Sequence, residues 1–334
     1  MKRIVLGLSD GVDSAVAAVL LKRQGYDVTG VFLDIGLTDG RATAERSARE
    51  AGIGFETVDI AELLNERVCK PFIDEYLCGR TPSPCVGCNR EVKLPALMEA
   101  ADRLGIGEVA TGHYVLKEGS RLYMGKPDCD QSYMLSRLTP EEVKRLVLPL
   151  GGMDKKETRA LAEEFGLSVC AKPDSRENCF IKEANYAEYI ERLRPGDIPP
   201  AGNVLFGGSV VDTHDGIHRY TVGQRWKKDM GDRRAYVGKI DAVNNEITLV
   251  LWEDLFTCKT VLTHVTFLSG CAPSDSFRGR IRVRHTRWEQ PSCTVKITGN
   301  TAYIETDEPL RAPAPGQSAA IYSENELLGG GIVS

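Results

Sequence analysis

Three of the ten cysteines lie in sequence surroundings that suggest chemistry rather than packing. Cys85 and Cys88 form a Cys-x-x-Cys pair in a stretch with two prolines and a glycine, which we expect to be an irregular loop, and Cys179 lies in a later polar stretch. In a reducing compartment this spacing indicates thiol–disulfide chemistry or half of a metal site. A structural zinc site would need a second Cys or His pair at finger-like spacing, which the sequence lacks. Thiol chemistry, part of a metal site and incidental cysteines remain as alternatives.

A second stretch that could do chemistry is a loop of small residues near the start of the chain. The apolar run 4–6 predicts a buried strand and residues 14–24 carry strong helix formers, with Gly7, Ser9 and Gly11 between them. A strand, a loop and a helix in this order point backbone amides and the positive end of the helix dipole at an anion. The Walker pattern and the dinucleotide fingerprint are both missing. We expect a nucleotide-phosphate site, with an ordinary strand-to-helix turn as the alternative.

The elements that must position these residues alternate between strand and helix as far as about residue 167. The predicted segments are strands at 28–33, 55–59 and 108–111, and helices at 42–51 and 96–104. This alternation predicts a doubly wound, mostly parallel sheet, whose ligands bind at the carboxyl ends of the strands. The phosphate loop, Leu33 and Gly112 all fall at such ends, so we expect them to line one crevice.

The segment that leads to Cys179 begins with another helix. Asp154 and Glu157 have the spacing of a capping box, which predicts a helix from there to about Phe165. A polar loop over residues 169–181 follows it and carries Cys179 towards its end.

Beyond residue 195 helical signals nearly vanish, and turn clusters separate short alternating segments. The alternating segments are 203–211, 216–222, 235–240 and 246–251. We expect an α/β protein with three domains. They are a catalytic domain with the doubly wound, mostly parallel sheet at residues 1–194, a small β domain at 195–255 and a C-terminal β-barrel at 256–334.

The composition is typical of a soluble globular protein, with 42% hydrophobic and 27% charged residues. No apolar run is long enough to span a bilayer, so no membrane partner is expected. The net charge of −5 argues against a general nucleic-acid binder, and a polyanionic partner would need a local basic surface. Because Met1 leads almost directly into a strand, we expect no secretory signal, a cytoplasmic location and reduced cysteines.

One such basic surface is predicted near the C-terminal end. Arg278, Arg280, Arg282 and Arg284 alternate with small and apolar residues, and on a strand this period places four guanidinium groups on one face, about 6.6 Å apart. Arginine is suited to bidentate contact with phosphate. A second basic cluster consists of Arg225, Lys227, Lys228, Arg233 and Arg234. The alternative is a merely solvated sheet face.

Further motifs occur in order along the chain. They are Gly-Arg-Thr-Pro-Ser-Pro-Cys-Val-Gly-Cys-Asn-Arg at 79–90, Ala-Thr-Gly-His-Tyr at 110–114, Asp-Gln-Ser-Tyr at 130–133, Lys-Pro-Asp-Ser-x-x-x-Cys-Phe-Ile at 172–181, Tyr-Thr-Val-Gly-Gln-Arg at 220–225, Pro-Gly-Gln at 315–317 and Leu-Gly-Gly-Gly at 328–331. With these motifs and the loop at 9–14, the chain resembles the tRNA-specific 2-thiouridylases, a family of PP-loop ATP pyrophosphatases, over nearly its full length. The resemblance implies an enzyme that replaces the 2-oxygen of the wobble uridine of certain tRNAs with sulfur.

The resemblance implies ATP as a substrate, because adenylation of the uracil 2-oxygen makes it a leaving group and releases pyrophosphate. The implied nucleotide-binding residues are Gly7, Leu8, Ser9, Asp10, Gly11, Val12, Asp13, Ser14, Leu33 and Gly112. Mg²⁺ is expected to offset the phosphate charge. Asp10 stands where the family pattern has glycine, and a carboxylate there repels pyrophosphate unless a metal ion lies between them.

The resemblance also implies how sulfur is delivered, with Cys88, Cys179 and Asp13 as the expected catalytic residues. Cys179 would carry a persulfide from a donor protein, and Cys88 would attack or resolve it, leaving a Cys88–Cys179 disulfide. Lys93, Arg90 or a helix end should then depress the pKa of the thiols. With Cys85 standing where other family members carry aspartate, Cys85, Cys88 and Cys179 could instead hold a 4Fe–4S cluster with one open iron. Both routes stay open at this point.

The tRNA partner is expected to present its anticodon stem-loop, from which the wobble uridine leaves the stack to reach the site. The expected contacts are Ser83, Pro84, Cys85, His113, Cys129, Asp130, Gln131, Arg280, Arg282, Val283 and Gln317. Cys129 stands where the family pattern has lysine, and Val283 where an aromatic residue is usual. Two rival functions are an ATP-dependent amide-forming synthetase with the same loop, and a paralogue that binds tRNA or nucleotide without turnover.

Overall fold

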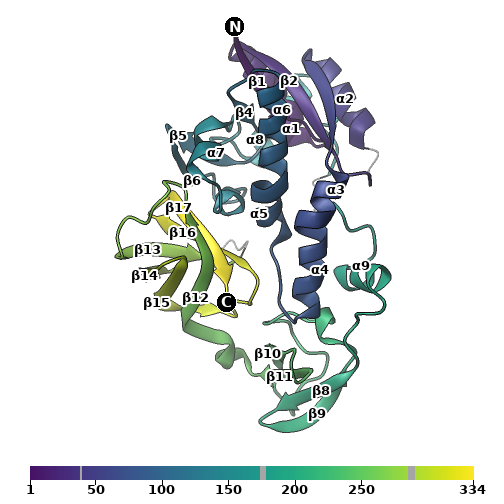
Figure 1. Ribbon diagram of the computed structural model, residues 1–334, viewed down its shortest axis with the longest axis vertical. Coiled ribbons are helices and arrows are strands. Elements are labelled where there is room, and N and C mark those ends of the chain that lie inside the picture. Colours follow the sequence, from purple (N-terminus) through teal and green to yellow (C-terminus); the bar gives the residue numbers. More distant parts are fainter. Residues whose placement is uncertain (38–39, 174–177, 285–289) are drawn as a thin grey trace.

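A five-stranded parallel sheet is the centre of the amino-terminal domain in the computed structural model, which describes residues 1–37, 40–173, 178–284 and 290–334 (Figure 1). Its strands, in spatial order, are β3 (Gly54–Asp59), β2 (Tyr26–Asp34), β1 (Lys2–Gly7), β4 (Val109–Ala110) and β7 (Leu146–Val147). All four neighbouring pairs are parallel, which confirms the predicted fold class.

Helices cover both faces of this sheet, which explains why its central strand is a continuous apolar run. Ile4 and Leu6 pack with α1 (Val12–Arg23), α2 (Gly40–Ala51) and α8 (Lys155–Glu164). Val5 points to the other side and packs with α6 (Leu94–Arg103) and α7 (Pro140–Arg145). The predicted capping box is present at α8, where the Glu157 amide donates to Asp154 at 2.9 Å and the Asp154 amide donates to Glu157 at 2.8 Å.

The Cys-x-x-Cys stretch is helical, so the prediction of an irregular loop was wrong. Pro84 lies at the start of α5 (Pro84–Cys88), where its fixed φ and missing amide proton fit a first helical turn. The π-helical turn η2 (Asn89–Lys93) joins α5 to α6. A second such turn, η1 (Asn65–Cys69), joins α3 (Ala61–Leu64) to α4 (Lys70–Leu77). Being three residues apart on one helix, the two cysteines share a face.

The small β domain is a four-stranded sheet with the order β10 (Tyr236–Asp241), β11 (Glu246–Val250), β8 (Gly202–Phe206) and β9 (Ser209–His214). It follows α9 (Tyr186–Leu193) and encloses its own core around Trp226. The segment 216–222, predicted as a strand-like segment, contains the 3₁₀ turn η4 (Ile217–Arg219) instead, because Gly216 has a φ of 113° that turns the chain.

Six antiparallel strands form the C-terminal barrel. Their spatial order is β12 (Phe256–Phe267), β15 (Thr301–Arg311), β14 (Ser292–Thr298), β13 (Ser276–Arg282), β16 (Ser318–Ser323) and β17 (Glu326–Val333), and β17 pairs with β12 to close the barrel. The Leu-Gly-Gly-Gly motif lies at this closure. A Cβ atom on Gly329 would lie 2.1 Å from the Thr266 carbonyl oxygen, so the closing strands can approach only at glycine.

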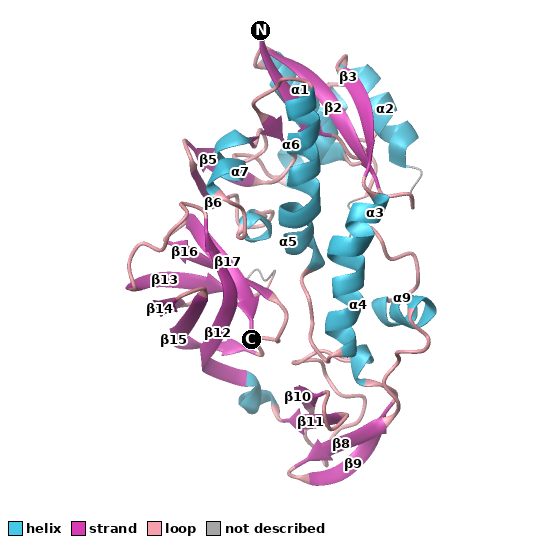
Figure 2. Cartoon of the chain, in the orientation of Figure 1, coloured by secondary structure: helices cyan, strands magenta, loops and turns pink. Residues whose placement is uncertain are grey.

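The barrel sheet continues into the catalytic domain (Figure 2). The hairpin of β5 (Val115–Glu118) and β6 (Arg121–Met124) extends the edge of β17, where Leu122 pairs with Leu327. The 3₁₀ turn η3 (Ser132–Leu135) follows this hairpin, and the short η5 (Trp252–Leu255) precedes the barrel. Within the described residues, no helix has both the length and the hydrophobicity needed to cross a bilayer.

All three domains meet at Thr81. Its amide donates to the Pro315 carbonyl of the barrel at 2.7 Å, and its hydroxyl donates to Thr221 of the small β domain at 3.2 Å. Close by, Arg311 of the barrel donates to the Gly223 carbonyl at 3.1 Å. The motifs at 79–90, 220–225 and 315–317 therefore meet in space at the junction of the domains.

A buried ion pair joins the barrel to the catalytic domain. The carboxylate of Asp130 pairs with the guanidinium of Arg282, and these side chains are only 6% and 4% exposed. Asp130 also accepts hydrogen bonds from the Gly125 amide at 2.8 Å and from the amide and hydroxyl of Ser132, each at 3.0 Å. These donors satisfy a charge that would be costly to bury alone.

The prediction that four arginines form one basic face was wrong for Arg282 and Arg284. Arg278 is exposed and pairs with Asp307, and Arg280 is half-buried, with its Nε donating to the Gln290 carbonyl at 3.2 Å. Arg282 is buried, and Arg284 lies past the end of β13 and donates to backbone carbonyls at 311 and 312. The alternation was present in the sequence, but the catalytic domain covers the end of the strand.

We expect Arg282→Ala to reduce the free energy of unfolding by about 3–5 kcal/mol, because it leaves the Asp130 carboxylate buried without its cation. Equilibrium urea denaturation measures the change. Arg278→Ala on the same strand is the matched control, and it should leave the free energy of unfolding nearly unchanged because its ion pair with Asp307 is exposed. Equal losses of unfolding free energy in the two variants would contradict a stabilising role of the buried pair between Asp130 and Arg282.

Candidate functional site

The phosphate loop between β1 and α1 is fixed by hydrogen bonds to its own hydroxyl groups. The Ser9 amide donates to Ser14 Oγ at 3.0 Å, the Ser9 and Ser14 hydroxyls lie 3.0 Å apart, and the Gly11 amide donates to Ser9 Oγ at 3.2 Å. No described side chain caps α1 at its first residue, Val12. An uncapped helix start with serine hydroxyls beside it is suited to bind an anion.

Gly112 packs directly against this loop, as the positions of the strand ends predicted. A Cβ atom on Gly112 would lie 3.1 Å from both the Asp13 carbonyl carbon and the Ser14 amide nitrogen, closer than backbone and side-chain atoms normally approach. A larger residue at this position would therefore require the phosphate loop or the segment after β4 to shift by a few tenths of an ångström. Leu33, half-buried at the carboxyl end of β2, lies at the same edge of the sheet.

Two lysines that sequence reasoning missed hold the aspartates of the loop. Asp13 accepts a hydrogen bond from the Tyr114 hydroxyl at 2.5 Å and pairs with Lys155 Nζ at 2.5 Å. Asp10 pairs with Lys172. Lys155 is the first residue of α8, within the capping box, and Lys172 is the first residue of the motif at 172–181. Their positions in these motifs were the only sequence signal that could have identified them. Residues 174–177 of that motif lie outside the described part of the chain.

The cysteines of α5 and the Cys179 loop border one hydrophobic cluster. Cys88 packs against this cluster, which contains Phe180, the neighbour of Cys179. Phe180 contacts Phe72 of α4 with ring centroids 5.2 Å apart. Cys85 Sγ lies 3.9 Å from Asn178 Oδ1, on the other side of Cys179. The fold thus brings together the three thiols that the sequence singled out.

The thiols have raised pKa values, contrary to the expectation of depressed ones. Desolvation by the surrounding protein raises the pKa of Cys88 to about 11, and it also raises the pKa of Cys85 and Cys179, although part of each of these two side chains is exposed to solvent. Lys93 lowers the pKa of all three because its ammonium group favours thiolates, but burial outweighs it. Arg90 points elsewhere, since its guanidinium donates to the Arg137 carbonyl at 2.6 Å and to Thr266 at 2.9 Å.

His113 lies next to the segment that packs against the phosphate loop. It follows Gly112, and its ring nitrogen Nδ1 lies 2.8 Å from the Thr111 hydroxyl. Burial and, to a lesser extent, Lys93 lower the pKa of His113 to about 3, so the ring is neutral at physiological pH. The same Lys93 also lowers the pKa of the three thiols.

The three thiols do not fit a shared metal cluster as they are arranged. In the part of the chain that the structure describes, no three His, Cys, Asp or Glu side chains are grouped closely enough to hold a metal ion. Asp10 and Asp13 do not form a metal site either, because their carboxylates pair with Lys172 and Lys155. We assign no step to an iron–sulfur cluster or to a metal ion bound by the protein alone.

The residues predicted to contact tRNA divide into two groups. Ser83 lies at the domain junction, where its hydroxyl accepts from the Ser318 amide at 3.0 Å, and Pro84, Cys85, Gln131, Arg280 and Gln317 are exposed or half-buried. Five others are buried. These are His113, Cys129, Asp130, Arg282 and Val283. Of these, Cys129 packs in the core of the catalytic domain and Asp130 pairs with Arg282.

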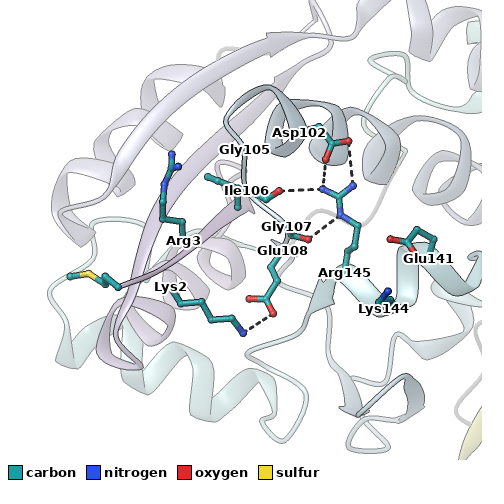
Figure 3. A pocket seen from close by; sticks show the side chains of 11 residues that line it. Lys2, Arg3, Asp102, Gly105, Ile106, Gly107, Glu108, Glu141, Lys144 and Arg145 are labelled. Carbon is teal, nitrogen blue, oxygen red and sulfur yellow. Dashed lines mark hydrogen bonds and ion pairs between the residues drawn. The ribbon is translucent and has the colours of Figure 1, made fainter.

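A cavity of about 690 Å³ lies at the opposite end of the parallel sheet, where β1 begins (Figure 3). Four of its charged side chains pair with one another. Arg145 binds Asp102 at 2.7 and 3.3 Å, and Lys2 binds Glu108 at 2.7 Å. Because ligands of such sheets bind at the carboxyl ends of the strands, we assign this cavity no role in the chemistry.

Comparison with known proteins follows the same division into three parts. The family description "tRNA methyl transferase HUP domain" matches residues 2–183, the "tRNA methyl transferase PRC-barrel domain" matches 187–250, and the "Aminomethyltransferase beta-barrel domain" matches 258–333. A protein of Caldanaerobacter subterraneus named tRNA-specific 2-thiouridylase MnmA 1 is 37% identical, over 99% of this chain and 97% of its own length. The chain belongs to the tRNA-specific 2-thiouridylase family.

Further relatives show the same full-length match. The tRNA-specific 2-thiouridylase MnmA of Syntrophotalea carbinolica is 38% identical over 100% of this chain and 99% of its own length. That of Clostridioides difficile is 35% identical over 99% and 98%. The family resemblance inferred from the ordered motifs is thereby confirmed.

Substituting Gly112 should weaken nucleotide binding. Gly112→Ala adds a methyl group 3.1 Å from the backbone of Asp13 and Ser14, so the loop must shift, and we expect ATP affinity to fall about tenfold or more. Equilibrium dialysis with ATP measures it. Gly107→Ala is the control, because an added Cβ there meets nothing within 4 Å, and it should leave the affinity unchanged.

Alkylation of Cys88 should depend on pH as its raised pKa requires. Because only the thiolate reacts, the rate should still be rising between pH 9 and about pH 11. Lys93→Met removes the cation that favours the thiolate, so it should raise the pKa of Cys88 further and slow alkylation at pH 8. Peptide mass spectrometry after iodoacetamide treatment measures both effects, with the exposed Cys271 as internal reference. A rate that levels off near pH 8 would contradict the burial argument.

Proposed function

We propose that this protein is an ATP-dependent tRNA 2-thiouridylase, which converts the wobble uridine of tRNA to 2-thiouridine with release of AMP and pyrophosphate. Membership of the family, with relatives of this name matching the chain end to end, supports the reaction. The observation that carries the assignment is that α5, with Cys85 and Cys88, packs with the Cys179 loop, while Gly112 packs against the phosphate loop.

The first half-reaction takes place at the phosphate loop. The 2-oxygen of the uracil attacks the α-phosphate of ATP, forming an adenylated base and expelling pyrophosphate. The hydroxyls of Ser9 and Ser14 and the start of α1 would bind the leaving phosphates. Mg²⁺ is expected to enter bound to ATP and to neutralise phosphate charge. Asp13, held between Tyr114 and Lys155, would fix the orientation of the loop.

The second half-reaction is proposed to use Cys179 and Cys88. The terminal sulfur of a Cys179 persulfide attacks carbon 2 of the adenylated base and AMP leaves. The Cys88 thiolate then attacks Sγ of Cys179, breaking the sulfur–sulfur bond and leaving the outer sulfur on the base. A Cys88–Cys179 disulfide results, and two electrons from an external dithiol restore the free thiols.

Two external partners follow from this scheme. A persulfide-bearing donor protein must reload Cys179, whose exposed side chain suits such a transfer. The anticodon stem-loop of tRNA must reach Cys85 and Cys88, which lie on α5 between the catalytic sheet and the barrel (Figure 2). Of the predicted tRNA contacts, those that are exposed or half-buried are the ones proposed to meet the nucleic acid directly.

Serine substitutions separate this function from an amide-forming synthetase, which has no need of these thiols. Cys88→Ser and Cys179→Ser should each abolish 2-thiouridine formation while tRNA-dependent release of pyrophosphate from ATP continues. The products are measured by nucleoside mass spectrometry and a pyrophosphate assay, with ATP, Mg²⁺ and a persulfide donor. Cys271→Ser, an exposed thiol of the barrel, is the control and should stay active. Unchanged thiolation by the Cys88 and Cys179 variants would refute the proposal, as would wild-type protein that releases no pyrophosphate.

A further inference from the structure

The ion pair between Asp10 and Lys172 is a feature that the reaction scheme leaves unused. Asp10 belongs to the phosphate loop, whereas Lys172 comes from the segment after α8, far away in sequence. Both side chains are 39% exposed, so solvent and a bound nucleotide can reach them. The pair therefore lies at the phosphate site without being sealed in the core.

Both partners of this pair are held in place. Arg159 of α8 donates to the backbone carbonyls of Cys170 and Lys172 at 2.9 and 3.0 Å, which anchors the segment that carries the lysine. On the other side, Asp10 packs against the first residue of α2, since a Cβ atom on Gly40 would lie 3.3 Å from Asp10 Oδ2. These contacts hold the backbone that carries Lys172 and one side of the Asp10 carboxylate, which keeps the two charges near the loop.

The two charges of the pair have opposite effects on bound phosphates, at a site that must bind and then release pyrophosphate. A lysine at a phosphate loop attracts the phosphates strongly, and the loop itself contains no lysine. An aspartate in the loop repels the phosphates by a similar amount at a similar distance. The net charge that the pair presents to the phosphates is zero.

We propose that Lys172 is the phosphate-binding cation of this loop and that Asp10 is its counter-charge, which limits how tightly pyrophosphate is held. When the triphosphate binds, Lys172 shares its ammonium group between Asp10 and the phosphates. When pyrophosphate has formed, Asp10 competes for the same ammonium group and favours release. This inference rests on the proposed function, because it assumes that the loop binds ATP.

A double-mutant cycle with inorganic pyrophosphate as the probe tests the inference. Pyrophosphate is titrated in the presence of Mg²⁺ by calorimetry into the full-length wild type and three variants. Asp10→Asn leaves the cation alone and should tighten binding about tenfold, and Lys172→Met leaves the carboxylate alone and should weaken it by a similar factor, as expected for one unit charge about 6 Å away in a partly solvated site. The double variant restores a net charge of zero and should bind within about threefold of wild type.

Controls distinguish the possible failures. Lys156→Met removes an exposed lysine next to Lys155 on α8 and should not change the affinity. Thermal melting of each variant reports whether it is folded, and the isosteric Asp10→Asn serves as the test if Lys172→Met is not. If wild-type protein binds neither ATP nor pyrophosphate, the proposed function fails. If wild type binds both but Asp10→Asn binds pyrophosphate no more tightly, only the role of the pair is overturned.

Discussion

The buried ion pair between Asp130 and Arg282 is the interaction on which the arrangement of the domains depends. Two opposite charges removed from water favour one geometry, because any shift that separates them leaves each charge desolvated. Around this pair, the catalytic domain and the barrel also share a continuous sheet through β6 and β17 and the bond from Arg90 to Thr266. The barrel therefore has a single position relative to α5, and the thiols of α5 lie in a defined place between the two domains.

The proposed nucleotide site is built from paired charges rather than from an excess of positive charge. Asp13 with Lys155 and Asp10 with Lys172 each cancel within the loop, and the backbone amides and hydroxyls remain as the local attraction for phosphate. The sulfur site follows a different principle. There desolvation by the surrounding protein raises the pKa of the thiols, and Lys93 is the group that opposes this effect. Thiolates would thus be scarce until a substrate or donor changes the surroundings of the cysteines.

Much of this could be predicted where local patterns decide the structure. The phosphate loop, the parallel sheet, the capping box at Asp154 and the β-rich C-terminal half follow from periodicity and from small residues at turns. The helical state of Cys85 could not be read in the same way, because proline breaks a helix except in the first turn, and the start of α5 was not evident. The pairing of the four-residue strand β6 with β17 depends on two segments about two hundred residues apart, which no local pattern specifies.

Long-range charge pairs were the other feature that could not be predicted from the sequence. Alternating arginines predict a spacing along a strand, but they do not reveal that Arg282 meets Asp130 across a domain boundary. Likewise, the unusual Asp10 was visible in the sequence, whereas its neutralisation by Lys172 was not. The raised pKa of Cys88 has the same origin, since burial by distant segments decides it rather than the neighbouring basic residues.

The hairpin of β5 and β6 has a mechanical consequence. Val115, the first residue of β5, directly follows Tyr114, whose hydroxyl binds Asp13 in the phosphate loop, and the other strand of the hairpin is bonded to the barrel. The hairpin thus connects the barrel, which pairs with β6, to Tyr114, which lies beside the phosphate loop. The hairpin therefore couples the position of the barrel to that of Tyr114, and through Tyr114 to Asp13 of the phosphate loop.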